Sequence, residues 1–248
     1  MNIFISNDDG IKSNGLVKLA ERLSLKNNVL VVAPDGNRSA CSHSLTISNT
    51  ISLDDTAFIK GCKAYSVSGT PVDCVKFAKL VFSDFDTDIV VAGINSGHNL
   101  GSDILYSGTV SIACEAAFFG HIAFAFSVYR FDEIDFEPYA VKAEQLIEFL
   151  LPYSSKDSIW NINFPACDFS EIKGVKITKL GKQIYSDEYI KVSENQYKLV
   201  GKCLSHDEND EDCDVEWINK GYITVTPILF NKTDYDKIKE VKKLCIEL

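Results

Sequence analysis

The chain has 248 residues, of which 46% are hydrophobic and 24% are charged, and its formal net charge at pH 7 is -10. This length is enough to bury one sizeable core, and the composition is that of an ordinary soluble globular protein. The acidic charge excludes the basic surface that a nucleic-acid polymer needs, and no run approaches the ~20 apolar residues of a membrane span. A small anion can still bind if a metal ion or backbone dipoles offset the charge.

Two observations bear on the compartment. The first apolar run, Ile3 to Ile5, is too short for a signal-peptide core and has no basic residue before it. None of the 8 cysteines belongs to a CxxC pair, which disfavours a zinc ribbon or a thioredoxin-type motif. Because several of them, such as Cys74 and Cys114, sit in apolar runs, we expect buried free thiols in a cytoplasmic protein.

Strands and helices alternate through most of the chain. Apolar runs without polar alternation predict strands buried on both faces, as in a parallel sheet, and runs with helical spacing predict the helices between them. The expected strands are 2–6, 28–34, 88–95, 121–129, 158–165 and 175–180, and the expected helices are 14–25, 71–82, 107–120 and 139–151. This alternation predicts an α/β fold with a doubly wound, mostly parallel sheet.

The chain becomes more polar and less regular after about residue 181. The elements expected there are a hairpin over 189–200, a strand over 221–228 and a helix over 233–247. The acidic run "HDENDEDCD" over 206–214 is typical of a solvent-exposed loop. We therefore expect a single domain with a core over 1–180 and a smaller β-rich extension over 181–248, which would pack on a partner subunit.

Polar clusters follow three of the predicted strands. Asn7 to Gly10 follows the first strand, 35–44 follows the second, and 95–103 follows the strand that ends at Ile94. Ligands of an open parallel sheet bind just beyond the carboxyl ends of its strands. We therefore expect the three clusters to lie close together, although they are distant in the sequence.

The adjacent carboxylates of Asp8 and Asp9 repel each other unless a cation neutralises them. Mg²⁺ and Mn²⁺ prefer carboxylate, carbonyl, hydroxyl and water oxygens. Gly10 lets the chain turn so that both carboxylates can approach one ion, and Ser39 and Asn95 are candidate neutral ligands from the neighbouring loops. One aspartate alone would indicate a turn residue or a helix cap, whereas the pair predicts a metal site.

A predicted helix begins at Ser107, Gly108 and Thr109, and free backbone N–H groups at a helix N-terminus bind phosphate. Gly108 permits a close approach, and both hydroxyls can donate. An ordinary capping turn is an equal alternative for this tripeptide. The sequence has no GxGxxG, Walker A or GxSxG motif, which disfavours dinucleotide binding and a serine hydrolase.

Several motifs occur together in one order. They are "SNDDG" at 6–10, "APDGNRSACSHSLT" at 33–46, "SGTPVDCV" at 68–75, "GINSGHNLGSDILYSGTVSIACEA" at 93–116, "NINFP" at 161–165, "TKLG" at 178–181 and "GYITVTP" at 221–227. In these motifs the chain resembles the SurE family, the survival-protein 5′-nucleotidases, over nearly its whole length. It departs at Ala40 and Ala117, where glycine is common in the family, and neither change removes a metal-binding side chain.

The resemblance implies a metal-dependent phosphatase that acts on nucleoside 5′-monophosphates, with 3′-monophosphates and short polyphosphate open as further substrates. By motif, the family's metal ligands correspond to Asp8, Asp9, Ser39 and Asn95, which would hold one divalent cation, Mg²⁺ or Mn²⁺, per subunit. The family fold has a Rossmann-like core and an extension that exchanges between subunits. A homodimer or homotetramer without membrane or nucleic-acid partners is therefore expected.

Several roles in the reaction stay open. The groups expected to hold the phosphate oxygens are Asn37, Asn95 and the amides of Ser107, Gly108 and Thr109. The nucleophile is either a metal-activated water, with Asp8 or Asp9 as general base, or Asp8 itself. His43 is a candidate acid for the leaving oxygen, and a hydrogen-bonded loop histidine is the alternative. The rival function is a nucleotide- or metal-sensing module without turnover.

Overall fold

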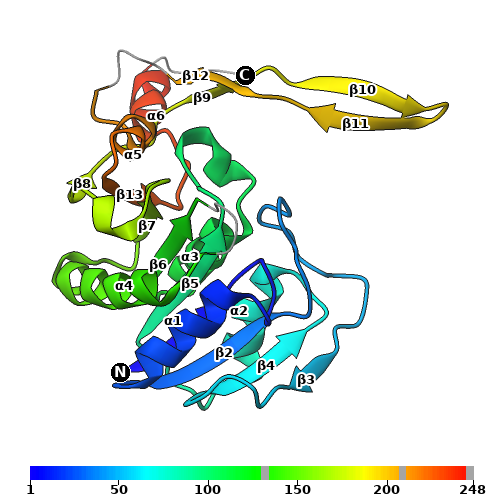
Figure 1. The fold of residues 1–248 in the computed structure, drawn as a ribbon, viewed down its shortest axis with the longest axis vertical. Helices are drawn as coiled ribbons and strands as arrows, with labels where there is room; N and C mark the ends of the chain where they lie inside the picture. The colour runs from blue at the N-terminus through cyan, green and yellow to red at the C-terminus, as the bar shows by residue number, and fades with distance from the viewer. Residues whose placement is uncertain (130–133, 207–210, 244–248) are drawn as a thin grey trace.

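One large sheet runs through the molecule (Figure 1). Its strands in chain order are β1 (Asn2–Ser6), β2 (Asn28–Pro34), β3 (Leu53–Asp55), β4 (Lys63–Val67), β5 (Ile89–Ser96), β6 (Ile122–Val128), β7 (Ser158–Phe164), β8 (Val175–Ile177) and β13 (Ile223–Leu229). The computed structural model describes residues 1–129, 134–206 and 211–243. The nine strands lie in the order β3-β4-β2-β1-β5-β6-β7-β13-β8, and the run from β4 to β7 is parallel throughout.

Helices cover both faces of this sheet, which confirms the predicted doubly wound α/β fold. The four long helices are α1 (Asn14–Ser24), α2 (Pro71–Leu80), α3 (Gly108–Phe118) and α4 (Glu137–Leu150). Side chains alternate between the faces, so that Ile3 and Ile5 join the core beneath α1 and α4 while Phe4 joins the core beneath α2 and α3. Both faces of β1 are therefore buried, as its uninterrupted apolar run predicts.

The strand that we assigned to the extension lies inside the main sheet. It is β13, which pairs antiparallel with β7 and parallel with β8. Ile223 and Val225 on this strand are buried in the core shared with β7. The prediction that the core ends at residue 180 is therefore wrong, because this strand returns to pair with the edge of β7 and its apolar side chains join the core. The strand predicted over 175–180 is also shorter than expected and ends at Ile177.

The end of the acidic run is buried, contrary to the predicted exposed loop. Residues 207–210 lie outside the described residues, but Cys213 and Asp214 have no exposed surface at the start of α5 (Asp214–Asn219). The Asp214 carboxylate accepts hydrogen bonds from the amides of Gly101 (2.9 Å) and Gly181 (2.7 Å). It thus joins the segment after β8 to the 3-10 helix η1 (Gly101–Leu105).

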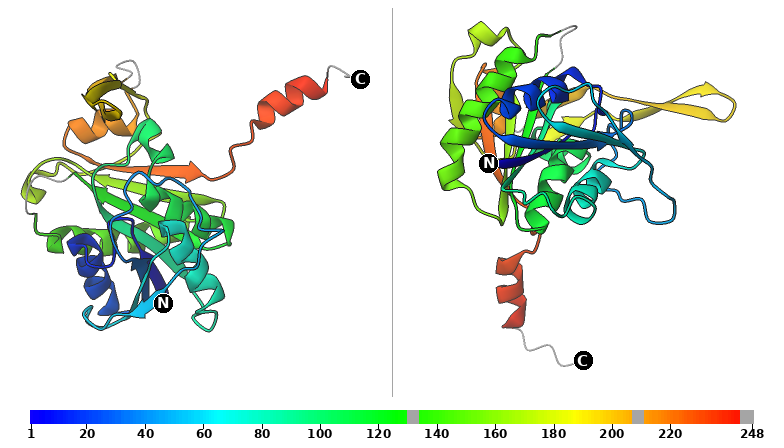
Figure 2. Two further views of the ribbon diagram at one scale, coloured as in Figure 1. Left: turned by 90° about the vertical axis from the view of Figure 1, so that its right-hand side faces the viewer. Right: turned by 90° about the horizontal axis from the view of Figure 1, so that it is seen from below.

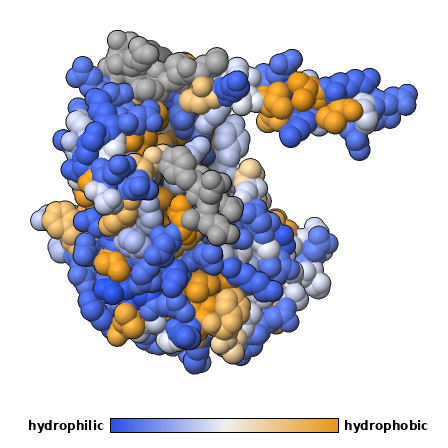
Figure 3. Space-filling view, viewed as in Figure 1, coloured by the Kyte–Doolittle hydropathy of each residue, from blue (hydrophilic) through white to orange (hydrophobic). Residues whose placement is uncertain are grey.

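Two parts project from the sheet. The predicted hairpin is present as β10 (Glu188–Ser193) and β11 (Gln196–Val200), carried on the ribbon of β9 (Gln183–Tyr185) and β12 (Cys203–His206) (Figure 1). Figure 2 shows that α6 (Tyr235–Lys242) also stands away from the body. Figure 3 shows apolar surface on the hairpin, where the exposed side chains include Ile190 and Val192; Tyr189 is exposed there as well.

Two findings concern the rest of the described chain. Within its ranges, no helix combines the length and the apolar character that crossing a membrane requires. No disulfide joins the seven cysteines that the structure describes.

Candidate active site

The turn after β1 is organised by Asn7, whose side chain is buried. Its carbonyl oxygen accepts from the Gly10 amide (3.2 Å), and its amide donates to the hydroxyl of Ser13 (2.6 Å), the N-cap of α1. Gly10 has a φ of 99°, and a Cβ there would lie 2.9 Å from the backbone of Gly36. The "SNDDG" motif therefore forms a tight turn that needs glycine and packs on the second polar cluster.

Asp8 lies at the N-terminus of α3 and is only 4% exposed. Its Oδ1 accepts a hydrogen bond of 2.5 Å from the Thr109 hydroxyl, and the Thr109 backbone also hydrogen-bonds to it. The pKa of Asp8 is raised to about 6, chiefly by burial; the hydrogen bonds from Thr109 act in the opposite direction, and the nearby charge of Asp9 adds to the rise. A cation at this carboxylate would offset the cost of its buried charge.

Asp9 joins all three polar clusters. Its Oδ2 accepts from the Ser96 amide at the end of β5 (2.9 Å), and its Oδ1 accepts from the side-chain amide of Asn37 (3.3 Å). The Arg38 amide donates to the carbonyl of Asp8 (2.7 Å), which ties the loop after β2 to the same turn. The predicted meeting of the three clusters is therefore confirmed.

The two candidate neutral ligands lie beside this turn. Asn95 donates its side-chain amide to the Gly97 carbonyl (2.7 Å), and no hydrogen bond from a described group reaches its carbonyl oxygen Oδ1. Ser39 is exposed, and its amide donates to the Asn37 side chain (2.9 Å). Each residue thus offers an oxygen, the donor atom that Mg²⁺ and Mn²⁺ prefer.

The donor set fits a hard divalent cation better than zinc. Among the described residues, no group of three or more His, Cys, Asp or Glu side chains could hold a metal. A metal at this turn would therefore rest on two carboxylates and neutral oxygens. This is the ligand chemistry of Mg²⁺ or Mn²⁺, whereas typical zinc sites include histidine nitrogen or cysteine sulfur.

At the start of α3, more of the polar groups already have hydrogen-bond partners within the protein than we expected. The Ser107 hydroxyl caps the helix by accepting from the Val110 amide (3.0 Å), and the Ser107 amide donates to the Ile104 carbonyl (3.3 Å). The Thr109 hydroxyl binds Asp8, so it is not directed at a phosphate as predicted. Glycine at position 108 permits the close approach of Asp8, because a Cβ there would lie 2.8 Å from Oδ2 of that residue.

A buried amide network, which the sequence analysis missed, holds the segment after β5. The backbone N–H of Asn99 donates to the side chain of Asn163 (2.8 Å), and the Asn99 carbonyl accepts from the side chains of Asn161 (2.8 Å) and Asn163 (3.0 Å). Next to it, burial lowers the pKa of His98 to about 4, so the neutral ring donates from Nε2 to the Phe164 carbonyl (2.6 Å). Asparagines at alternate positions of the otherwise apolar run "NINFP" are the signal that could have revealed this network.

His43 has a partner outside the carboxylate turn. Its Nε2 lies 2.8 Å from Oε2 of Glu115 on α3, and Oε1 of Glu115 lies 2.8 Å from Nζ of Lys76 on α2. The hydrogen bond to His43, followed by that to Lys76, lowers the pKa of Glu115. The alternative prediction of a hydrogen-bonded loop histidine therefore agrees with the structure.

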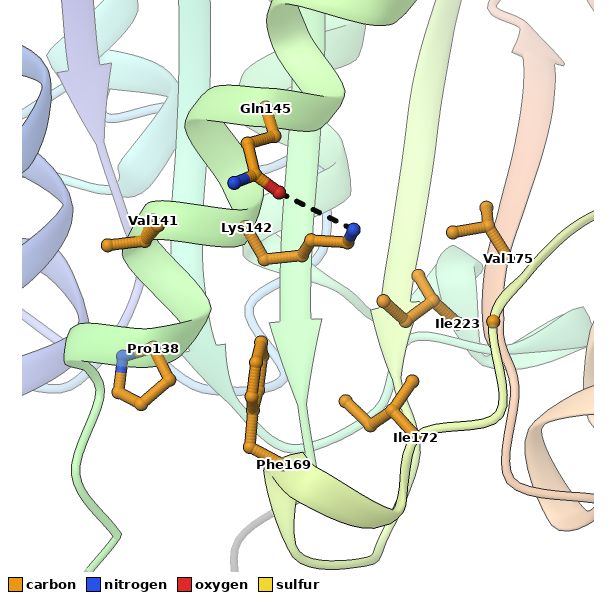
Figure 4. Close-up of a pocket in the computed structure, with 9 residues that line it drawn as sticks. Pro138, Val141, Lys142, Gln145, Phe169, Ile172, Val175 and Ile223 are labelled. Carbon is orange, nitrogen blue, oxygen red and sulfur yellow. Dashed lines mark hydrogen bonds between the residues drawn. The ribbon is translucent and has the colours of Figure 1, made fainter.

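A cavity of about 420 Å³ lies away from these residues (Figure 4). It is formed by α4, the short helix η3 (Phe169–Glu171) and the edge of the sheet at Val175 and Ile223. Its walls are mostly apolar, and Lys142 on α4 donates to Gln145 there (3.5 Å). None of the candidate site residues lines it.

Fold and site together define a doubly wound α/β protein with an acidic, oxygen-lined site at the carboxyl edge of its parallel strands. The family model of survival protein SurE matches residues 3–187. The chain is 38% identical over 251 residues to the 5′-nucleotidase SurE of Clostridium botulinum (strain Eklund 17B / Type B), covering 98% of this chain and 99% of that protein. It is 43% identical over 246 residues to the 5′-nucleotidase SurE of Thermoanaerobacter sp. (strain X514), covering 96% of each.

A solved structure agrees with these sequence matches. The crystal structure of the SurE protein from Aquifex aeolicus superposes with a TM-score of 0.81 at 33% identity, covering 98% of both chains. The chain belongs to the SurE family, as its motifs predict.

Proposed function

We propose that this chain is a 5′-nucleotidase, a metal-dependent phosphomonoesterase that converts nucleoside 5′-monophosphates to nucleoside and phosphate. The observation that carries the proposal is the buried Asp8 beside Asp9 at the N-terminus of α3, next to oxygen donors from two other loops. Relatives that match nearly the whole chain bear the name 5′-nucleotidase SurE. Short polyphosphate and 3′-monophosphates are candidate further substrates.

The proposed metal ligands are Asp8, Asp9, Ser39 and Asn95. They would hold one Mg²⁺ or Mn²⁺ per subunit, and two carboxylates would leave the site neutral enough to admit an anionic substrate. When bound, the ion would polarise the phosphoryl group and offset the charge that develops in the transition state.

The protein's own groups would orient the substrate. The Gly108 amide and the side chains of Asn37 and Ser107 are the proposed donors to the phosphate oxygens, and preorganised donors of this kind account for much of the catalysis in phosphoryl transfer. Thr109 has a different task from the one predicted, because its hydroxyl and backbone fix the orientation of the Asp8 carboxylate.

Two nucleophiles remain to be separated by experiment. A water molecule could attack while a site carboxylate takes its proton, or Asp8 could attack and form an aspartyl-phosphate. Rapid quenching of a reaction with labelled substrate distinguishes them. Label retained on the protein supports Asp8 as the nucleophile, and its absence supports water.

We also propose that subunits associate through the projecting hairpin and α6. Tyr189 and Val192 on the hairpin and Tyr235 on α6 are exposed apolar or aromatic side chains on parts that have few contacts with the body. Burying them in a homodimer or homotetramer would remove this surface from water. The mass of the protein in solution tests the proposal, and a monomer at micromolar concentration would contradict it.

Phosphate release from AMP tests the activity itself. We expect release with Mn²⁺, loss of release when EDTA is added, and recovery when Mn²⁺ is returned in excess. Repeating the assay with several 5′- and 3′-nucleotides defines the substrate class. Tight binding of Mn²⁺ and AMP without release would instead support a sensing module.

A further inference from the structure

The loop that carries Asn37 and Ser39 has little apolar packing to hold it. It runs from the end of β2 to β3, and Ile47 within it is 86% exposed. Ala40 and Ser42 have left-handed φ values of 57° and 56°, which residues other than glycine seldom adopt. A segment of this kind keeps one conformation only when polar contacts restrain it.

One of these contacts is the ionic cluster on α3; another is the pair of hydrogen bonds from the Thr46 amide to the buried Asp73 carboxylate (3.3 Å). The Glu115 side chain is only 8% exposed, and each of its oxygens has a cationic or donor partner, Nε2 of His43 and Nζ of Lys76, at 2.8 Å. Nζ of Lys76 also lies 4.9 Å from the centre of the Phe119 ring, which helps to fix it. The Glu115 carboxylate is buried whereas the His43 side chain is 44% exposed, and hydrogen bonds to a buried charged group are stronger than those of a fully exposed ion pair.

The hydrogen-bond partner of His43 lies further along α3 than the proposed phosphate site. Glu115 stands two turns beyond Gly108 on α3, which is about 10 Å along the helix axis. Just before α3 begins, the Ser42 hydroxyl donates to the Leu105 carbonyl (2.6 Å) and the Ser42 amide donates to the Tyr106 carbonyl (3.2 Å). A group that protonates the leaving oxygen must lie within hydrogen-bond reach of it, and this geometry does not place His43 there.

We propose that His43, Glu115 and Lys76 form an ionic anchor that holds the loop bearing Asn37 and Ser39 against α3. His43 is then a positioning residue that acts on the reaction through the ligands of the metal and the phosphate. The kinetic consequences rest on the proposed function, whereas the restraint of the loop does not.

Hydrogen exchange of backbone amides measures the restraint without metal or substrate. In His43→Ala, we expect the amides of Ser42 and Thr46 to exchange about 10-fold faster, because a hydrogen bond to a charged group has been removed. His43→Gln keeps a donor that can reach Glu115 and should restore slow exchange. Glu115→Ala should resemble His43→Ala, and protected amides of β1 and β5 control for intact folding in every variant.

Mn²⁺ affinity and kinetics show how the anchor affects the site. We expect His43→Ala to weaken Mn²⁺ binding, measured by electron paramagnetic resonance, by about 10-fold, as losses of outer-shell partners do. The KM for AMP should rise, while kcat at saturating Mn²⁺ and AMP changes much less, because the reacting groups are untouched. His43→Gln should regain most of the Mn²⁺ affinity.

Two results would overturn the anchor. The first is unchanged exchange and Mn²⁺ affinity in His43→Ala together with a kcat that falls by about 100-fold, the pattern of a lost general acid. The second is unchanged exchange, Mn²⁺ affinity and kinetics in both His43→Ala and Glu115→Ala. If the wild-type protein releases no phosphate from AMP, the proposed function fails, yet exchange and Mn²⁺ binding still decide whether the anchor exists.

Discussion

The two sides of the candidate site are built differently. Asp8 is buried and bound to the first turn of α3, and Asp9 accepts from a strand amide, so the sheet and a helix position both carboxylates. Asn37 and Ser39 lie on an exposed loop that is held by polar contacts. The difference indicates that the carboxylates are preorganised by the core, whereas the positions of Asn37 and Ser39 depend on a few polar contacts.

The largest effect should come from the buried side of the site. Asp8→Asn removes a charge but keeps nearly the same shape, so we expect an intact fold, weak Mn²⁺ binding and a loss of phosphate release of roughly 10³-fold. Steady-state assays with AMP, together with circular dichroism, measure both outcomes. Turnover equal to that of the wild type would show that Asp8 is not part of the active site.

Moving Asp8 without altering it should have the next largest effect. An alanine Cβ at position 108 would lie 2.7 Å from Cβ of Asp8, so Gly108→Ala must displace the carboxylate. We expect activity to fall by about 100-fold, since small misplacements of reacting groups are costly. Gly36→Ala is the matched control, because the nearest atom to its Cβ is 4.0 Å away. Equal activity of the two variants would show that the position of Asp8 is not critical.

Breaking the amide network should affect the free energy of unfolding more than the catalytic activity. Asn163→Ala leaves the buried amide of Asn99 without its partner, so we expect the free energy of unfolding to fall by about 1–3 kcal/mol. Chemical denaturation measures this change, and the exposed Asn49→Ala controls for a generic asparagine effect. If Asn163→Ala and Asn49→Ala have equal free energies of unfolding, the network does not contribute to stability.

The smallest effect concerns the strained loop on the exposed side. Ala40 has a φ of 57°, whereas Ala117 is helical and buried in α3. Ala40→Gly should therefore stabilise the protein by about 0.5–1 kcal/mol, because glycine adopts this φ without strain. Ala117→Gly should destabilise it by about 1 kcal/mol. Denaturation curves that shift in the same direction for both variants would contradict this account of the loop.

The alternation of strands and helices could be predicted from the sequence because buried parallel strands are continuously apolar. The carboxylate turn could be predicted because Asp8 and Asp9 follow such a strand directly. Strands β3 and β4 escaped prediction, since β3 is exposed throughout and β4 is short and mixed in polarity. The burial of Asp214 escaped prediction as well, because an acidic run does not show that its last carboxylate will bind backbone amides.

Other features of the site could not be predicted, because they depend on tertiary contacts that local sequence patterns do not indicate. A helix N-terminus binds an anion, but the sequence does not say whether that anion is a substrate or the protein's own carboxylate. In the structure, Thr109 binds Asp8, which leaves fewer groups for a phosphate than predicted. Likewise, His43 is distant in sequence from Glu115, and only the fold shows that the two side chains meet.

The central claim is that neighbouring carboxylates on a rigid turn hold one divalent cation. Titration of the metal-free protein with Mn²⁺ tests it most directly, with calorimetry as the readout and the double variant Asp8→Asn, Asp9→Asn alongside. We predict one Mn²⁺ per subunit in the wild-type protein and no measurable binding in the folded double variant. Binding of equal affinity and stoichiometry in both proteins would contradict the claim.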